Sequence, residues 1–126
     1  MIMNTELEKI DQEDLDQMIK DHQLWLNNDP KGKRLVLVNK DLRGSDLSGS
    51  NLIGSDLRGC DIDYACWPLW CGSFDVKVDK RIFTQLAYHL CKLDVDENEE
   101  LKQYQELLKP IANQFHRIDR DCERLI

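Results

Sequence analysis

Five cysteines and three histidines are the side chains of this 126-residue chain best suited to metal binding or nucleophilic chemistry. A structural zinc site usually shows its cysteines in close pairs such as C-x-x-C. No such pair occurs here; Cys66 and Cys71 are five positions apart, and His89 and Cys91 fall on different faces of a predicted helix. We therefore expect no metal site and no cofactor, with the cysteines filling small or apolar positions.

Nucleophilic catalysis needs a cysteine or serine beside a general base. Cys71 and His116 could meet in space, but no spacing in the sequence indicates that they do. The glycines of "GSDLSGSNLIG" do not form the G-x-G-x-x-G that precedes a helix in phosphate-binding loops. Because no convergent set of polar groups can be recognised, we expect no catalytic residues and no enzymatic activity.

The odd number of cysteines favours reduced thiols over a disulfide framework. The N-terminus "MIMNTELEKIDQEDLDQ" lacks a basic region followed by an apolar run, and no stretch approaches the length of a membrane span. These features predict a cytoplasmic protein without a membrane partner.

A five-residue register dominates the middle of the chain, where a small residue, an Asp or Asn, an apolar residue and often a glycine recur in order. The central apolar positions are Leu37, Leu42, Leu47, Leu52, Leu57, Ile62 and Trp67. Since helices repeat near 3.6 residues and strands near 2, this period fits neither element. It predicts a narrow solenoid, in which each unit forms one side and a turn.

Each position of the unit has a physical reason in such a solenoid. The leucine and the small residue two positions before it point inward, because so narrow an interior has little room. The Asp or Asn accepts a local backbone N–H, and the glycine occupies a corner that needs unusual dihedral angles. Cys60 lies at a small-residue position and is expected inside.

This run resembles the pentapeptide-repeat family, whose unit is a small residue, Asp or Asn, then Leu or Phe, then two variable residues. The resemblance implies an α+β protein with a short right-handed quadrilateral β-helix, four units per coil. It covers residues 35–69, under two coils. The stretch "DIDYACWPLWCGSFDVKVDKR" is also similar to short pentapeptide proteins of Gram-positive bacteria and their phages.

So short a coil needs covered ends, because terminal coils expose apolar interior and strand edges. We predict one domain over residues 1–126, with a capping helix in 1–31 (Thr5 and Glu8 forming its capping box). A plug and one short strand follow in 70–79, then helices at 80–93 and 96–126. A homodimer through the C-terminal helices would bury further surface, as the family resemblance implies.

The negative charge lies outside the coil. Residues 1–31 carry a net charge of −5 and residues 94–106 also −5, whereas residues 35–69 carry only −2. This distribution disfavours direct nucleic-acid binding and favours a partner with a basic surface. The predicted partner-binding residues are Asp11, Glu13, Asp14, Asp16, Asp96, Glu97, Glu99 and Glu100.

These features predict a non-enzymatic interaction module that binds a protein of a bacterial host. Its small size, its acidity and the phage resemblance point to an inhibitor of a nucleic-acid-handling machine, for example an anti-CRISPR. One alternative is a small-ligand- or metal-binding module with a pocket at Tyr64, Trp67, Trp70 and His116. Another is a DNA mimic that inhibits DNA gyrase, as some pentapeptide proteins do.

Overall fold

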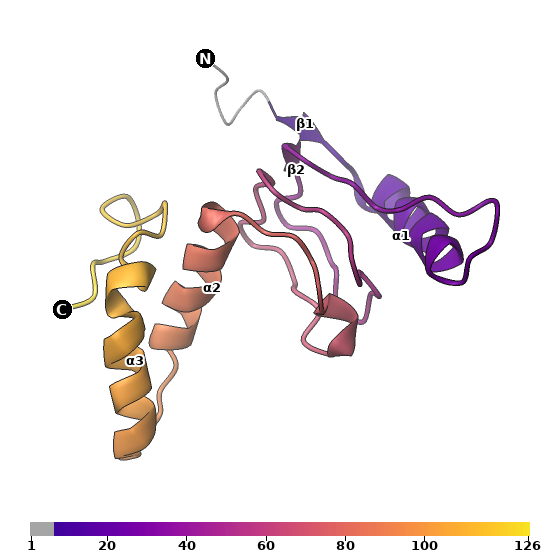
Figure 1. Ribbon diagram of the computed structural model, residues 1–126. Coiled ribbons are helices and arrows are strands. Elements are labelled where there is room, and N and C mark those ends of the chain that lie inside the picture. The colour runs from indigo at the N-terminus through magenta and orange to yellow at the C-terminus, as the bar shows by residue number, and fades with distance from the viewer. Residues whose placement is uncertain (1–6) are drawn as a thin grey trace. The chain divides into compact units, whose positions relative to one another are not determined.

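The computed structural model describes residues 7–126 of the protein, and the chain divides into two compact units, residues 1–79 and 80–126. The single domain expected over residues 1–126 stays a prediction. The elements of Figure 1 are, in chain order, β1 (Glu8–Lys9), α1 (Gln12–Leu26), β2 (Lys40–Asp41), a 3₁₀ helix (Cys71–Ser73), α2 (Lys80–Cys91) and α3 (Glu99–Ala112).

Between α1 and α2 the chain winds into stacked turns (Figure 1). Parallel bridges join Val36 to Asp56, Asp41 to Asp61 and Asp46 to Cys66, so the chain returns beside itself after twenty residues. Twenty residues are four of the five-residue units. The turns are held by parallel backbone pairing between successive coils, which is the kind of pairing that a β-helix uses.

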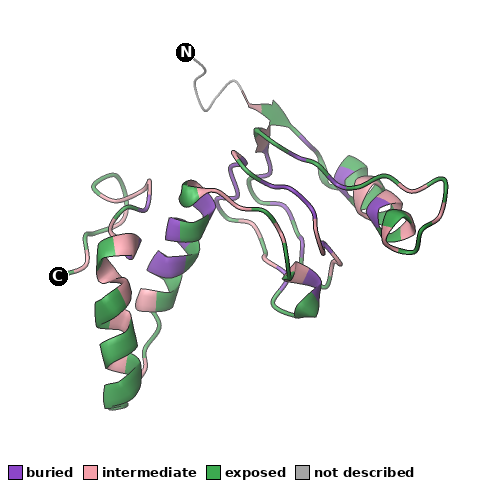
Figure 2. Cartoon of the chain, in the orientation of Figure 1, coloured by how far each residue is buried: buried purple, intermediate pink, exposed green. Residues whose placement is uncertain are grey.

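The interior of this coil is the leucine stack that the register predicts. The side chains of all five central leucines from residue 37 to residue 57 are inaccessible to solvent. Ser45, Ser55 and Cys60, two positions before a central residue, are buried with them. Trp67, the last central residue of the register, is only half-buried. Figure 2 shows the buried positions along the turns.

Each unit turns through the same local contacts, and the unit that begins at Asp41 illustrates them. The Arg43 N–H donates to Asp41 Oδ1 and the Ser45 N–H donates to the Leu42 carbonyl, both at 3.0 Å. Gly44 has φ 72°, as the third residue of a type II turn requires. The expected roles of the acidic and glycine positions are therefore confirmed. The same acceptor role falls to Asp46, Asn51, Asp56 and Asp61.

One residue is inserted into the register at the corner before the 3₁₀ helix. The Leu47 N–H donates to the carbonyl of Cys66, nineteen positions on, but the Leu52 N–H donates to Gly72, twenty positions on. Pairing nevertheless continues to Lys77, which bridges Asp56. The coil therefore extends beyond residue 69, and a single bridge stands where a short strand was expected in 74–79.

The predicted N-terminal helix begins later than its capping box implied. Glu8 lies in β1, where its backbone pairs in parallel with Lys40 and its carboxylate forms an ion pair with the Lys40 ammonium at 2.7 Å. The N-cap of α1 is Asp11, whose Oδ1 accepts the Asp14 N–H at 2.9 Å. Thr5, the other half of the predicted box, lies outside the described residues. Backbone pairing with β2 thus displaces the first helical turn.

The second unit is a helical hairpin, in which α2 and α3 lie side by side (Figure 1). Its core contains Ala87 and Tyr88 from α2, Ala112 at the end of α3, and Phe115. The helix predicted over 96–126 is shorter, because α3 ends at Ala112 and the following residues form turns. Pro110 lies within α3 and does not divide it.

Candidate interaction surfaces

The four acidic residues predicted on the first helix are all exposed, but they differ in what they do. Asp11 caps α1, and Asp16 Oδ1 accepts a hydrogen bond from Gln12 Nε2 at 2.8 Å. Within residues 7–126, the carboxylates of Glu13 and Asp14 make no hydrogen bond or ion pair. Those two carboxylates are the ones on α1 that a partner could engage without loss of an internal contact.

The predicted acidic residues near the third helix are also exposed. Glu97 and Glu99 lie 3.4 and 3.7 Å from the Lys102 ammonium, and Glu100 accepts a hydrogen bond from the Tyr104 hydroxyl. Glu99 and Glu100 form the first turn of α3, where negative charge interacts favourably with the helix dipole. Asp96 precedes the helix with φ 55°.

Each of the two predicted sets of site residues is divided between the two compact units. The acidic residues of α1 belong to the unit 1–79 and those near α3 to the unit 80–126. Likewise Tyr64, Trp67 and Trp70 belong to the first unit and His116 to the second. Trp70 donates from its indole nitrogen to the Ser50 carbonyl at 2.9 Å. The partner surface and the ligand pocket therefore both stay predictions.

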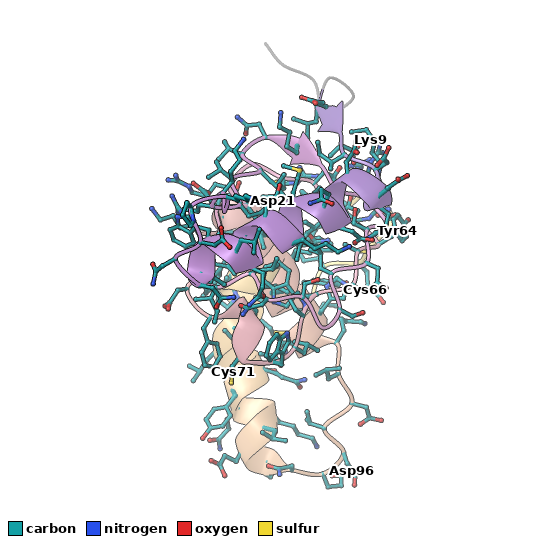
Figure 3. All side chains as sticks on the ribbon, turned by 90° about the vertical axis from the view of Figure 1, so that its right-hand side faces the viewer. Lys9, Asp21, Tyr64, Cys66, Cys71 and Asp96 are labelled. Atoms are coloured by element: carbon teal, nitrogen blue, oxygen red, sulfur yellow. The ribbon has the colours of Figure 1, made fainter. Side chains whose placement is uncertain are left out.

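The thiols are distributed between the core and the surface. Cys60 is buried and donates to the Leu37 carbonyl at 2.7 Å, and burial raises the pKa of its thiol to about 11. Cys66 and Cys71 are exposed, and Figure 3 labels both on the coil. No group of three or more metal-ligating side chains occurs in residues 7–126.

Two exposed arginines form ion pairs with buried aspartates of the coil. The Arg43 guanidinium binds Asp41 through Nε and Nη2 at 3.0 and 2.9 Å, and Arg58 binds Asp56 in the same way at 2.9 and 2.6 Å. The Arg58 hydrogen bonds lower the pKa of Asp56 to about 2. The tripeptide Asp-Leu-Arg, which occurs at residues 41–43 and 56–58, is the sequence signal for this pair.

An exposed apolar stripe runs along α2 and ends at Leu93, two residues beyond the helix. Its side chains recur at spacings of three, four and three, and between 37% and 59% of each is exposed. The stripe consists of Phe83, Leu86, Leu90 and Leu93. Such spacing is that of the apolar seam along which helices pair.

Parallel pairing every twenty residues around a leucine stack defines a class of protein, a small coil built from five-residue repeats. The family model described as "Pentapeptide repeats (8 copies)" matches residues 36–66, so this part of the chain consists of pentapeptide repeats. No curated protein and no solved structure matches the chain. Within residues 7–126, no helix is long and apolar enough to cross a membrane.

Proposed function

We propose that the protein is a non-enzymatic interaction module that binds the basic surface of a partner protein. Pentapeptide-repeat proteins are generally structural or interaction proteins. The single observation that supports this assignment best is the pair of exposed carboxylates at Glu13 and Asp14, which make no hydrogen bond or ion pair within residues 7–126. Exposed like charges raise the rate of encounter with an oppositely charged partner.

The proposal extends to the geometry of the coil. A right-handed quadrilateral β-helix is the form that pentapeptide repeats imply, and the twenty-residue return at Val36, Asp41 and Asp46 supports four sides per coil. The pairing to Lys77 supports slightly more than two coils. So short a coil matches only a small length of duplex DNA, which favours a protein surface as the target over extended DNA mimicry.

The partner that we propose is a nucleic-acid-handling protein of a bacterial host, and the module would be a phage or mobile-element inhibitor acting in the host cytoplasm. Such enzymes carry basic surfaces because they bind phosphate backbones. A CRISPR effector is the leading candidate and DNA gyrase is the second. A small-ligand or metal-binding module remains the alternative from a different class.

Enzyme inhibition assays with the purified protein test this proposal. We expect inhibition of DNA cleavage by a CRISPR nuclease, or of supercoiling by gyrase, that weakens with added salt. The double substitution Glu13→Gln with Asp14→Asn is expected to weaken inhibition at least ~tenfold, since each desolvated charge contact contributes roughly 1 kcal/mol or more.

The matched control is Asp75→Asn, which removes an exposed acid outside the predicted set. It is expected to leave inhibition within about twofold of the original protein. If neither enzyme is inhibited, or if the α1 double substitution has no effect, this function is wrong. A small molecule or metal retained in native mass spectrometry would favour the alternative.

We also propose that the α2 stripe binds a second copy of the chain. Residues 80–92 contain Lys80, Arg81 and Lys92 and no acid, whereas residues 94–106 carry six acids and one lysine. The basic α2 of one protomer therefore complements the acidic α3 region of the other, which also exposes Leu101, Tyr104 and Leu107. A 47-residue unit gains needed burial by such pairing.

Sedimentation equilibrium tests this second proposal. The original chain is expected to be a dimer, and the double substitution Leu86→Lys with Leu90→Lys to be a monomer with unchanged helix content. Leu69→Lys, at an exposed leucine of the other unit, is the matched control and is expected to remain dimeric. A monomeric original chain, or a dimeric double variant, overturns the assignment.

A further inference from the structure

His22 is a histidine of α1 that is inaccessible to solvent, and both of its ring nitrogens are engaged. Nδ1 accepts the backbone N–H of Leu35 at 2.9 Å, and Nε2 lies 2.8 Å from the Ile53 carbonyl oxygen. An amide N–H can only donate and a carbonyl oxygen can only accept. The ring is therefore neutral, with its proton on Nε2, and any other protonation state breaks at least one of the two bonds.

These two bonds join three segments that are distant in sequence. His22 belongs to α1, Leu35 to the segment that enters the coil, and Ile53 to a corner of the first coil. Trp25, one turn further along α1, stacks on the imidazole with ring centroids 5.4 Å apart. The ring thus lies at the contact between the helix and the N-terminal end of the coil.

The charges around the ring oppose its protonation. Arg34, beside Leu35, donates from Nε to the Gly54 carbonyl at 2.9 Å and acts on His22 through its positive charge. Lys33 precedes it, and its backbone N–H donates to the Asp21 carbonyl. On α1 itself, Asp21 accepts from Gln17 through its carboxylate. The corner at residues 51–54 has no charged side chain.

Protonation of Nδ1 would place two N–H donors against each other and a charge in a buried position. Burial is the main cause that lowers the pKa of His22 below its usual 6.5, and Arg34 lowers it further. The neutral ring therefore favours the folded contact at all pH values above about 6.5. That contribution is lost as the pH falls below 6.5 and through the lower pKa of the folded protein.

We propose that His22 is a pH-sensitive clasp, which holds α1 on the N-terminal end of the coil when neutral and releases it when protonated. Release would uncover the coil edge at residues 40–54. The groups that pair with this edge, β1 and the side chains of Gln12 and Arg34, all belong to the same N-terminal segment. The inference does not depend on the proposed partner.

Hydrogen exchange of the full chain, followed by NMR between pH 7.5 and pH 5, tests the clasp. We expect the α1 amides, after correction for intrinsic exchange, to open at least ~tenfold more at pH 5, with α2 unchanged. We expect the pH midpoint of α1 opening to coincide with the midpoint of the His22 ring titration. The NMR chemical shifts of the imidazole ring at pH 7.5 are expected to show the proton on Nε2.

His22→Gln is the decisive variant, because a glutamine side chain can accept from Leu35 and donate to Ile53 without titrating. Its α1 exchange is expected to be independent of pH in this range. The matched control His89→Gln, at an exposed histidine of α2, is expected to keep the pH response. Equal α1 exchange at both pH values in the original chain overturns the clasp. A His22→Gln variant whose α1 amides open at pH 5 as much as those of the original chain also overturns it. Should His22→Gln not fold, mismatched midpoints of ring titration and opening in the original chain overturn it.

Discussion

The side-chain amide of Gln12 pairs with the backbone of Asp46 as a neighbouring strand would. Gln12 Nε2 donates to the Asp46 carbonyl at 3.0 Å, and Gln12 Oε1 accepts the Asp46 N–H at 2.8 Å. On the preceding side of the coil, β1 pairs with β2, and on the following side His22 bonds to Ile53. The N-terminal segment thus supplies partners for backbone groups that an open coil end would leave unpaired.

Gln12→Glu should destabilise the coil, because the carboxylate cannot donate to the Asp46 carbonyl. We expect a loss of about 1–3 kcal/mol in the free energy of unfolding, measured by urea denaturation. Gln17→Glu is the matched control, since Gln17 on the same helix also bonds to an aspartate four residues on but, within residues 7–126, makes no side-chain hydrogen bond to the coil. Equal losses in the two variants would show that the Asp46 contact contributes nothing.

Leu47→Ala should remove packing from the middle of the leucine stack. Since Leu47 is inaccessible to solvent, we expect a loss of about 2–5 kcal/mol in the free energy of unfolding. Leu69→Ala, at a leucine with 91% of its surface exposed, should change it by less than about 0.5 kcal/mol. Chemical denaturation measures both, and a comparable effect at the two positions would contradict an interior built on the central leucines.

Gly49→Ala should cost about 1–2 kcal/mol through its backbone alone. Gly49 has φ 70°, and no atom lies within 4 Å of the position that a Cβ would take, so strain and not collision is the cause. Gly49→Asn should cost less, because asparagine tolerates this conformation, and Asn39 holds φ 59° in the same register position. Thermal unfolding of the two variants provides the comparison; a larger loss for Asn would refute this explanation.

The Asp56–Arg58 pair should make the coil resistant to acid. Arg58 holds the pKa of Asp56 at about 2, below the 3.8 of an ordinary aspartate. Its stabilising contribution is therefore complete above about pH 3.8 and lost as the pH falls toward 2. Arg58→Gln should move the acid-unfolding midpoint, followed by circular dichroism, to higher pH. Arg120→Gln, at an exposed arginine of the other unit, should leave it unchanged.

Sequence analysis predicted the coil interior and its corners but missed the contacts that close its N-terminal end. Neither His22 nor Gln12 belongs to a sequence pattern that indicates these contacts. Glu8 was placed in a helix, although its backbone pairs with Lys40. Nothing in the local pattern around these residues indicates their partners, which lie thirteen to thirty-four positions away.

The five-residue pattern by itself determined that the middle of the chain would stack leucines inside a coil, because each unit carries its own turn and its own inward residue. The turn contacts span only two or three residues, so local chemistry sets them. The tertiary structure alone decided how the N-terminal segment meets the coil edge and where the register gains a residue before Gly72. Those features depend on backbone groups that come together only after the coils have stacked, and a one-dimensional pattern does not contain that information.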